Sequence, residues 1–231
     1  MVQLRERPRE GRISAKKRGI LEAAARVFRR KGLYAASMRE IAAELDMAVG
    51  NLYYYFDDKE ELLAFIQQTT LTGLRSLAGR VAALDMEADG KLWLLIAGHV
   101  TWLNEETPGS VAHLEVEALS DKRRGPIQEG RDAYERTFRQ LIEEGVESGV
   151  FQVPDSKVAA LALLGAANWS VKWFRPDGGK PAREIGRDLA DLLVRGLLAP
   201  GRLDGFSAPS LDLLAALMAP EELDRLSGKT S

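Results

Sequence analysis

The chain has 231 residues, of which 45% are hydrophobic and 29% are charged, the balance of an ordinary globular protein. It contains no cysteine, which excludes disulfides and thiolate metal sites and favours a reducing compartment. Because no apolar run approaches the ~18 residues of a membrane span and the start lacks a signal segment, we expect a cytoplasmic protein.

Charge is unevenly distributed along the chain. The formal net charge is −2, but residues 1–60 carry 13 Lys and Arg against 9 Asp and Glu, a net of +4 that leaves −6 for the remainder. A basic head on an acidic body fits a polyanion-binding module joined to a part that avoids polyanions. A solvated basic tail would show the same imbalance, so charge alone does not identify the partner.

Hydrophobic spacing predicts helices along almost the whole chain. Residues Ser14–Lys31 place apolar side chains on one stripe with charges opposite, and Gly32 ends this helix. Ser37 and Glu40 have the spacing of a capping box, in which each side chain satisfies the other residue's backbone N–H. They predict the start of a short second helix.

A turn at Asp46-Met47 is followed by another short helix, expected from about Val49 to Tyr55. The acidic run at Asp57-Asp58 marks the next helix start, because acids favour the positive end of the helix dipole. That helix is expected to continue to about Val81. Two short helices joined by a tight turn and braced by a longer one predict a helix-turn-helix.

The later segments also predict helices, and no strand pattern or internal repeat is found. The connector Gly149–Pro154 can be briefly extended, and Asp155 can cap the helix that follows it. After Pro200-Gly201 comes a tail in which Leu211 to Met218 can form an extra helix. The remaining expected helices span Lys91–Asn104, Gly109–Leu119, Pro126–Ser148, 156 to about Trp173, and Ile185–Leu198.

The helix after the Asp46 turn is the candidate DNA-reading element. In a helix-turn-helix this helix enters the major groove and shows its N-terminal residues to base edges. Leu52 and Phe56 lie at i and i+4 and should pack inward. The three consecutive tyrosines 53–55 cannot all be buried at helical spacing, so at least one should face solvent. Tyrosine hydroxyls suit phosphates, and Asn51 suits a base edge or a phosphate.

The order and spacing of these residues resemble the TetR family of bacterial transcription regulators. The resemblance covers about forty-five residues: Arg18 to Ala24, Phe28, Lys31-Gly32, Ser37, Ile41-Ala42, Gly50 to Phe56, and Lys59 to Leu62. It implies DNA contacts, mostly to phosphates, by Ser37, Arg39, Val49, Asn51, Tyr53, Tyr54 and Lys59. Asp46 departs from the family's usual glycine in the turn, but aspartate also tolerates the left-handed conformation, so the turn should survive.

The resemblance also implies a domain plan and an assembly. It divides the all-α chain into a helix-turn-helix domain (1–60), a helical effector-binding and dimerisation domain (61–200) and a tail (201–231). The last two bundle helices carry more apolar surface than one chain needs, which favours a twofold dimer on palindromic double-stranded operator DNA. Closing the monomer's own core is the alternative use of that surface. The candidate interface residues are Leu161, Leu164, Gly165, Asn168, Val171-Lys172, Leu189, Leu192, Leu193, Gly196 and Leu197.

The segment from Leu164 to Gly179, with residues near 144–151 and 185–197, resembles a TetR subgroup that responds to acyl-coenzyme A thioesters of fatty-acid, aromatic-acid or steroid catabolism. Such an effector needs an apolar tunnel for its acyl chain, cations for its phosphates and a ring that stacks on adenine. Core packing of the aromatics and a solvated basic loop are the alternatives. The candidate tunnel residues are Trp93, Trp102, Leu114 and Phe138, the candidate phosphate cations are Lys122, Arg123, Lys172 and Arg175, and Trp169 or Trp173 could stack on adenine.

The leading hypothesis is a repressor that an effector, an acyl-CoA, releases from its operator. The alternatives are a repressor for a drug or free fatty acid, and a helical module whose basic segment docks on acidic surfaces. We expect neither an enzyme nor a cofactor, because no nucleophile elbow or phosphate-binding glycine loop occurs. His113 and Glu117 share a helix face, but two histidines without cysteine do not predict a metal site.

Overall fold

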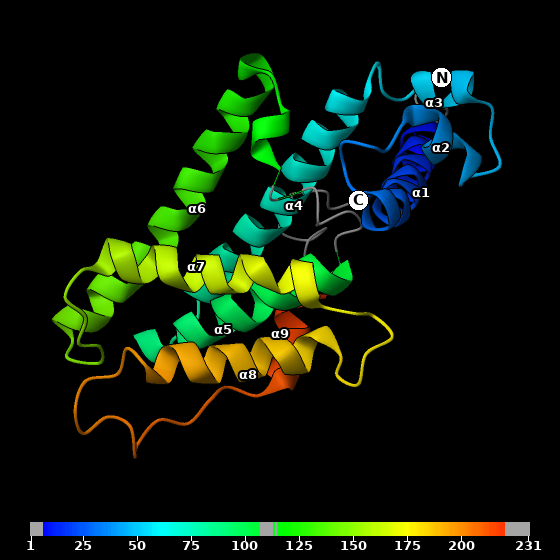
Figure 1. The fold of residues 1–231 in the computed structure, drawn as a ribbon. Helices are drawn as coiled ribbons and strands as arrows, with labels where there is room; N and C mark the ends of the chain where they lie inside the picture. The colour runs from blue at the N-terminus through cyan, green and yellow to red at the C-terminus, as the bar shows by residue number, and fades with distance from the viewer. Residues whose placement is uncertain (1–6, 107–112, 114, 220–231) are drawn as a thin grey trace, which may run out of the picture. The chain divides into compact units, whose positions relative to one another are not determined.

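The computed structural model describes residues 7–106, 113 and 115–219. Apart from one isolated antiparallel bridge between Phe151 and Leu198, the described chain contains only helices and connections, which confirms the all-α prediction (Figure 1). The helices are α1 (Arg7–Lys31), α2 (Met38–Ala43), α3 (Val49–Tyr53), α4 (Lys59–Ala82), α5 (Ala88–Thr101), α6 (Asp121–Glu147), α7 (Ser156–Trp173), α8 (Ala182–Arg195) and α9 (Leu211–Met218). A π-helical turn, η1 (Trp102–Glu106), extends α5, and a 3₁₀ turn, η3 (Val116–Ala118), precedes α6.

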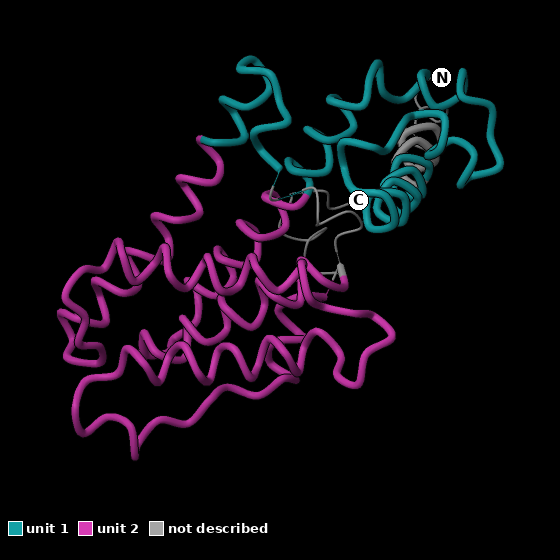
Figure 2. The backbone as a smooth tube through the Cα atoms, in the orientation of Figure 1, with its two compact units in different colours: residues 1–69, 107–128 teal, residues 70–106, 129–231 magenta. Residues whose placement is uncertain are grey.

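The chain forms two compact units (Figure 2). Unit 1 contains residues 1–69 and 107–128, and unit 2 contains residues 70–106 and 129–231. The division falls inside α4 and inside α6, so each of these helices contributes to both units. Unit 1 is therefore assembled from two segments that are distant in the sequence.

The core of unit 1 is a small three-helix cluster in which α2 packs against both α1 and α3. Ile20 and Phe28 of α1 and Ile41 of α2 are at most 1% exposed, as are Leu52 and Phe56 around α3. These are the apolar positions of the amphipathic pattern, and burying each contributes about 1.5–3 kcal/mol. A rigid core of this kind sets the orientation of α3.

Unit 2 is built around α5, whose residues are buried along most of its length. This helix contacts α7, α8 and α9, and Figure 1 shows α7, α5 and α8 running side by side. Gly186 permits α8 to lie close to α5, because a Cβ there would lie 2.6 Å from the carbonyl oxygen of Ala97. A helix that is apolar all round belongs in the middle of a helical domain.

Several helix ends differ from the predicted ones. Helix α6 begins at Asp121, five residues before the predicted start at Pro126, because the Ser120 carbonyl accepts the backbone N–H groups of Arg123 and Arg124. Of the predicted helix Gly109–Leu119, residues 109–112 and 114 lie outside the described residues, and the described part holds only the 3₁₀ turn. The extra helix in the tail is present as α9.

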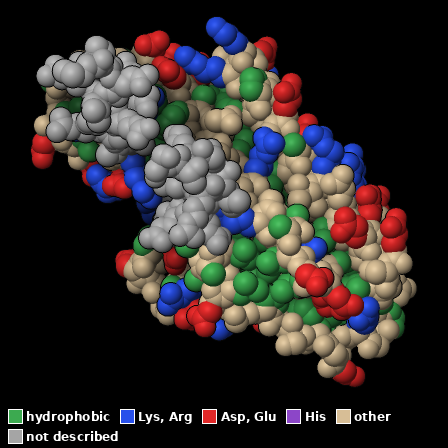
Figure 3. Space-filling view, turned by 180° about the vertical axis from the view of Figure 1, so that it is seen from behind, with side chains coloured by type: hydrophobic (Ala, Val, Ile, Leu, Met, Phe, Trp, Pro, Cys, Tyr) green, Lys and Arg blue, Asp and Glu red, His purple; other side chains and the backbone are tan. Residues whose placement is uncertain are grey.

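The surface is mixed in charge. On the face shown in Figure 3, acidic and basic side chains are interspersed, and hydrophobic side chains gather in a patch over unit 2. Within the residues that the structure describes, no helix combines the length and the apolar character needed to cross a bilayer.

Candidate DNA interface and effector site

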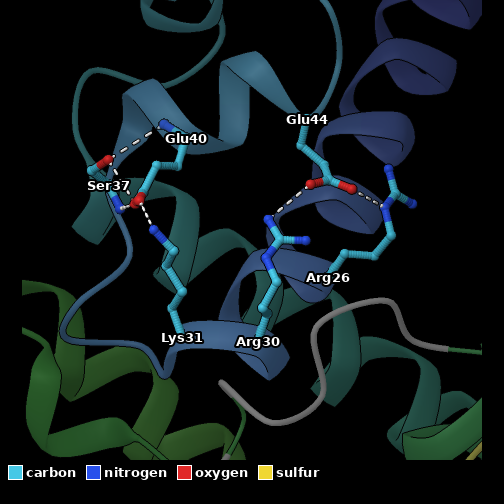
Figure 4. A network of polar contacts seen from close by, with 6 residues as sticks. All are labelled: Arg26, Arg30, Lys31, Ser37, Glu40 and Glu44. Atoms are coloured by element: carbon cyan, nitrogen blue, oxygen red, sulfur yellow. Dashed lines mark hydrogen bonds and ion pairs between the residues drawn. The ribbon is translucent and has the colours of Figure 1, made fainter.

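Helix α2 starts with the predicted capping box. The Ser37 hydroxyl accepts the Glu40 backbone N–H at 3.3 Å, and the Glu40 carboxylate accepts the Ser37 backbone N–H at 2.9 Å. Lys31 at the end of α1 pairs with the same carboxylate (Figure 4). Hydrogen bonds from Lys31 and then Ser37 hold the pKa of Glu40 at about 2, so this carboxylate stays charged at neutral pH.

A second polar contact orients α2 on α1. Glu44 at the end of α2 accepts Arg26 at 2.8 Å and Arg30 at 3.0 Å, as Figure 4 shows. The two guanidinium groups, Arg26 first, lower the pKa of Glu44. Two arginines of the basic N-terminal segment therefore brace the helix-turn-helix, a use that net charge could not reveal.

The turn between α2 and α3 has the predicted conformation. Asp46 has a φ of +49°, and it alone among the described non-glycine residues is left-handed. The Met47 backbone N–H then reaches the Ala42 carbonyl, and α3 follows from Val49. Leu52 is fully buried, whereas Tyr53 and Tyr54 are 48% and 79% exposed. The predicted division of α3 into a packed and an open face is confirmed.

A surface groove of about 500 Å³ runs along the start of α2 and α3. Five of the seven predicted DNA contacts line it: Ser37, Arg39, Val49, Tyr53 and Lys59. The other two are also exposed, Asn51 on α3 and Tyr54 at its C-cap. Four short-range features, namely the capping box, the turn, and the starts of α3 and α4, thus bring together residues spread over positions 37–59.

Lys59, the first residue of α4, points back towards the turn after α1. Its ammonium donates to the carbonyl oxygens of Leu33 at 3.1 Å, Tyr34 at 3.2 Å and Ala36 at 2.9 Å. Arg39 differs, because its exposed side chain makes no hydrogen bond or ion pair with any residue that the structure describes. The two cations of the groove therefore differ in their hydrogen bonding: Lys59 is bonded within the protein, whereas Arg39 is exposed.

The first turn of α4 is held by the start of α6. Arg123 contacts Asp58 at 2.8 Å and Glu60 at 3.1 Å, and the Ser120 backbone N–H donates to Glu60 at 2.7 Å. The Ser120 hydroxyl and amide lower the pKa of Glu60. These residues form what we call the α4–α6 junction, consisting of Asp58, Glu60, Ser120 and Arg123. All four lie in unit 1.

The interior of unit 2 contains a polar network centred on α5. His99 is 1% exposed, and its ring nitrogens contact the Tyr134 hydroxyl at 3.2 Å and the Asn168 side-chain oxygen at 3.1 Å. Because that amide oxygen only accepts, the Nε2–H of His99 donates to it and Nδ1 accepts the Tyr134 hydroxyl. Burial lowers the pKa of His99 to about 4 and raises that of Tyr134. Both groups are therefore neutral at pH 7.

The predicted tunnel residues of unit 2 are in two kinds of surroundings. Trp93 and Phe138 are fully buried, and the Trp93 indole donates to Asp191 of α8 at 2.6 Å. Trp102 lies against α4, where a Cβ on Gly73 would lie 1.8 Å from its ring. Its indole nitrogen is buried and has no hydrogen-bond acceptor among the described residues. An unsatisfied buried donor is uncommon and marks a place where a ligand oxygen or water can bind.

The predicted adenine and phosphate contacts are exposed, except for the half-buried Arg123. Trp169, Lys172 and Trp173 lie on the last turns of α7, and Arg175 follows just after its end. Lys122 and Arg123 lie in unit 1, and Arg123 is engaged in the junction. Leu114 lies outside the described residues. The structure thus brings part of the predicted set into unit 2 and leaves two cations in unit 1.

A cavity of about 270 Å³ lies among the described residues of unit 2, between α4, α5 and α6. Its walls include Val81, Leu95 and Leu141, with Lys91 and Glu144 as the charged groups. None of the predicted ligand residues lines it. The cavity is smaller than a coenzyme A ester requires, so it does not by itself define the effector site.

Comparison with known proteins gives two family matches. Residues 20–66 match the bacterial regulatory proteins of the tetR family, and residues 85–197 match the tetracyclin repressor-like C-terminal domain. The crystal structure of the TetR regulator PfmR from Thermus thermophilus is 34% identical, with 76% of this chain and 97% of that chain covered and a TM-score of 0.70. The chain belongs to the TetR family.

Two further relatives show what this family member is similar to. The transcriptional repressor KstR2 of Rhodococcus jostii is 24% identical over 81% of this chain and 93% of its own length. The crystal structure of AibR in complex with isovaleryl coenzyme A and operator DNA is 26% identical, with 80% and 98% of the two chains covered and a TM-score of 0.67.

Membership of the TetR family settles the class of function. The chain is a helix-turn-helix transcriptional repressor that binds operator DNA, forms dimers and responds to a small-molecule effector, and it is not an enzyme. Unit 1 carries the DNA-binding domain match, and most of the C-terminal match lies in unit 2.

Sequence reasoning missed the long-range polar contacts inside this TetR chain. His99 and Asn168 were separated by 69 residues, and Asn168 was placed on the dimer face. The partial signal for His99 was a single histidine in an otherwise apolar stretch of α5. Nothing in the sequence pattern indicated that Asp191 would accept the Trp93 indole or that Arg123 would pair with Asp58.

Proposed function

We propose that this TetR-family repressor is released from its operator by an acyl-coenzyme A thioester. The similarity to AibR, whose structure contains isovaleryl coenzyme A and operator DNA, is the observation that carries this proposal. In the proposed arrangement, groove residues hold operator phosphates and bases, and unit 2 holds the effector. The proposed DNA contacts are Ser37, Arg39, Val49 and Tyr53 in the groove, with the exposed Asn51 and Tyr54 beside them.

The chemistry of unit 2 supports a ligand with an apolar chain and a carbonyl group. Phe138 supplies aromatic surface next to the neutral His99–Tyr134 pair. These surroundings do not favour a charged head group. The buried indole N–H of Trp102 can donate to a carbonyl oxygen. A thioester offers such an oxygen at the head of an apolar chain.

The cations proposed for the phosphates are Lys172 and Arg175. Both are exposed near the C-terminal end of α7, beside Trp169 and Trp173. Arg123 is a poorer candidate, because a phosphate would have to compete with its ion pairs to Asp58 and Glu60. Free fatty acids and uncharged apolar compounds, the alternative effectors, need only one cation or none.

The test is displacement of operator DNA by a panel of effectors. Acyl-CoA esters of increasing chain length should release the protein, and free CoA should do so weakly. Each added buried methylene contributes about 0.8 kcal/mol, so affinity should rise about fourfold per carbon until the site is full. Release by an uncharged apolar compound, with no response to any acyl-CoA in displacement or in melting temperature, would contradict the proposal.

Single variants locate the phosphate contacts. Lys172→Ala and Arg175→Ala should weaken acyl-CoA binding without changing DNA affinity. Lys157→Ala is the matched control, because Lys157 is an exposed lysine near the other end of α7. Equal losses in all three variants would indicate a general charge effect and no specific phosphate site.

A further inference from the structure

We infer that Lys59 is a positioning residue of the DNA-reading surface and does not itself bind a DNA phosphate. The family resemblance implies a direct phosphate contact at this position, and Lys59 does line the groove. The state of its ammonium group points to a different role.

The hydrogen-bonding capacity of Lys59 is fully used inside the protein. An ammonium group has three N–H donors and no acceptor. The three carbonyl oxygens of Leu33, Tyr34 and Ala36 lie 2.9–3.2 Å from Nζ, one for each donor. A phosphate at Lys59 would therefore have to displace a carbonyl, and two of these three bonds are partly buried. Displacing a buried carbonyl leaves it unsatisfied, which has a free-energy cost.

The carbonyls belong to a turn that needs this cation. Helix α1 ends at Lys31, the following Gly32 reverses the chain with a φ of +80°, and Leu33 and Ala36 are then buried. The carbonyl oxygens here follow the negative end of the α1 dipole, where a cation is favoured. Residues 33–36 lead directly into Ser37, the N-cap of α2. By gathering three carbonyls, Lys59 fixes the path of the chain into α2 and the position of Ser37 and Arg39.

Lys59 is in turn held in place by its neighbours. Asp58 accepts the Glu61 backbone N–H at 2.6 Å and the Arg123 guanidinium, and Glu60 accepts Arg123 and Ser120. The first turn of α4 is thereby fixed on both sides of Lys59. A continuous set of polar contacts runs from the start of α6 through α4 to the turn before α2.

Two variants separate positioning from phosphate binding. Arginine binds phosphate at least as well as lysine, but its planar guanidinium does not reproduce a compact ammonium among three carbonyls. Lys59→Arg should therefore weaken operator binding about tenfold or more and lower the unfolding midpoint by about 5 °C. Lys59→Met should do the same and leave the slope of log affinity against log salt unchanged. Faster hydrogen exchange at the Glu40 and Ile41 amides, which bond to Ser37, should accompany both losses.

Arg39→Gln is the matched control, because it removes the other cation of the same groove. It should reduce the salt slope by about one unit per half-site and leave the unfolding midpoint unchanged. The inference is overturned if Lys59→Arg binds operator like wild type. It is equally overturned if Lys59→Met unfolds like wild type and loses salt slope as Arg39→Gln does. Should Lys59→Met fail to fold, Lys59→Arg still decides the question.

Discussion

The buried His99 is a polar residue in the otherwise apolar middle of α5. His99 lies between Tyr134 and Asn168, and its ring stacks near that of Tyr134 at 5.7 Å between centroids. Burial is the main cause of its lowered pKa, the hydrogen bond to Asn168 opposes it, and the charge of Arg131 adds to it. The folded protein therefore holds this histidine neutral at a pH where the unfolded chain protonates it.

The lowered pKa of His99 predicts a loss of stability in mild acid. Because the folded pKa is about 4 and the ordinary value is 6.5, the stabilisation is complete above pH 6.5 and is lost as the pH falls towards 4. The expected loss is about 3 kcal/mol, since each pKa unit corresponds to 1.36 kcal/mol. In urea unfolding at fixed protein concentration, the free energy of unfolding should fall with pH in this way in wild type and much less in His99→Gln. Parallel pH profiles for the two proteins would contradict it.

At the scale of elements, α7 and α8 expose an apolar surface that one chain leaves uncovered. Val158, Leu161, Trp169 and Trp173 of α7 are 45–62% exposed, and Leu192 of α8 is 69% exposed. Leu164 and Leu193, which also belong to the predicted dimer face, are only partly exposed. Leu192 belongs to the predicted dimer face and is the most exposed leucine of α8, although α8 itself spans Ala182–Arg195 and not the predicted Ile185–Leu198. Trp169 and Trp173 also lie on this stripe, which gives them a second use besides adenine stacking.

Leu192→Glu should therefore disrupt the dimer and leave the fold intact. A carboxylate at this exposed position costs the monomer little but is strongly unfavourable when buried between subunits. Sedimentation should show a monomer with a wild-type circular dichroism spectrum. Leu193→Glu is the comparison, because that side chain is partly buried within the chain and should lower the melting temperature. A Leu192→Glu protein that remains dimeric at micromolar concentration would exclude this part of α8 from the interface.

On the scale of the whole molecule, two helices belong to both compact units. Helices α4 and α6 each begin in unit 1 and end in unit 2, and the α4–α6 junction ties their first turns together. Arg123 and Asp58 are 65 residues apart in the sequence. The N-terminal DNA-binding unit is thus completed by a segment from the middle of the chain.

Arg123→Ala should distinguish a structural junction from a ligand contact. If Arg123 is a junction residue, the substitution should lower the unfolding midpoint by about 3 °C at low salt and by less at high salt, because partly exposed ion pairs are screened. Its affinity for acyl-CoA should stay unchanged. Lys122→Ala, at the neighbouring exposed position, should change neither property. A stable Arg123→Ala protein with weakened acyl-CoA binding would instead support the phosphate contact expected from the sequence.

The sequence by itself determined the features that depend on short-range chemistry. The capping box at Ser37, the left-handed turn at Asp46 and the Asp155 cap of α7 are all present as predicted. Each involves residues two to five positions apart, which meet whatever the rest of the fold does. The family resemblance of the DNA-reading segment could be found for the same reason, because it rests on the order and short spacing of residues.

Tertiary structure alone decided which polar groups are already satisfied. Lys59 donates three hydrogen bonds to a turn 23–26 residues earlier, and Arg123 pairs with carboxylates 63–65 residues earlier. His99 stays neutral in mild acid because it is buried beside Tyr134 of α6 and Asn168 of α7. Residue type and spacing reveal which groups can bind phosphate or a ligand. Whether they remain available depends on partners that only the folded chain brings within hydrogen-bonding distance.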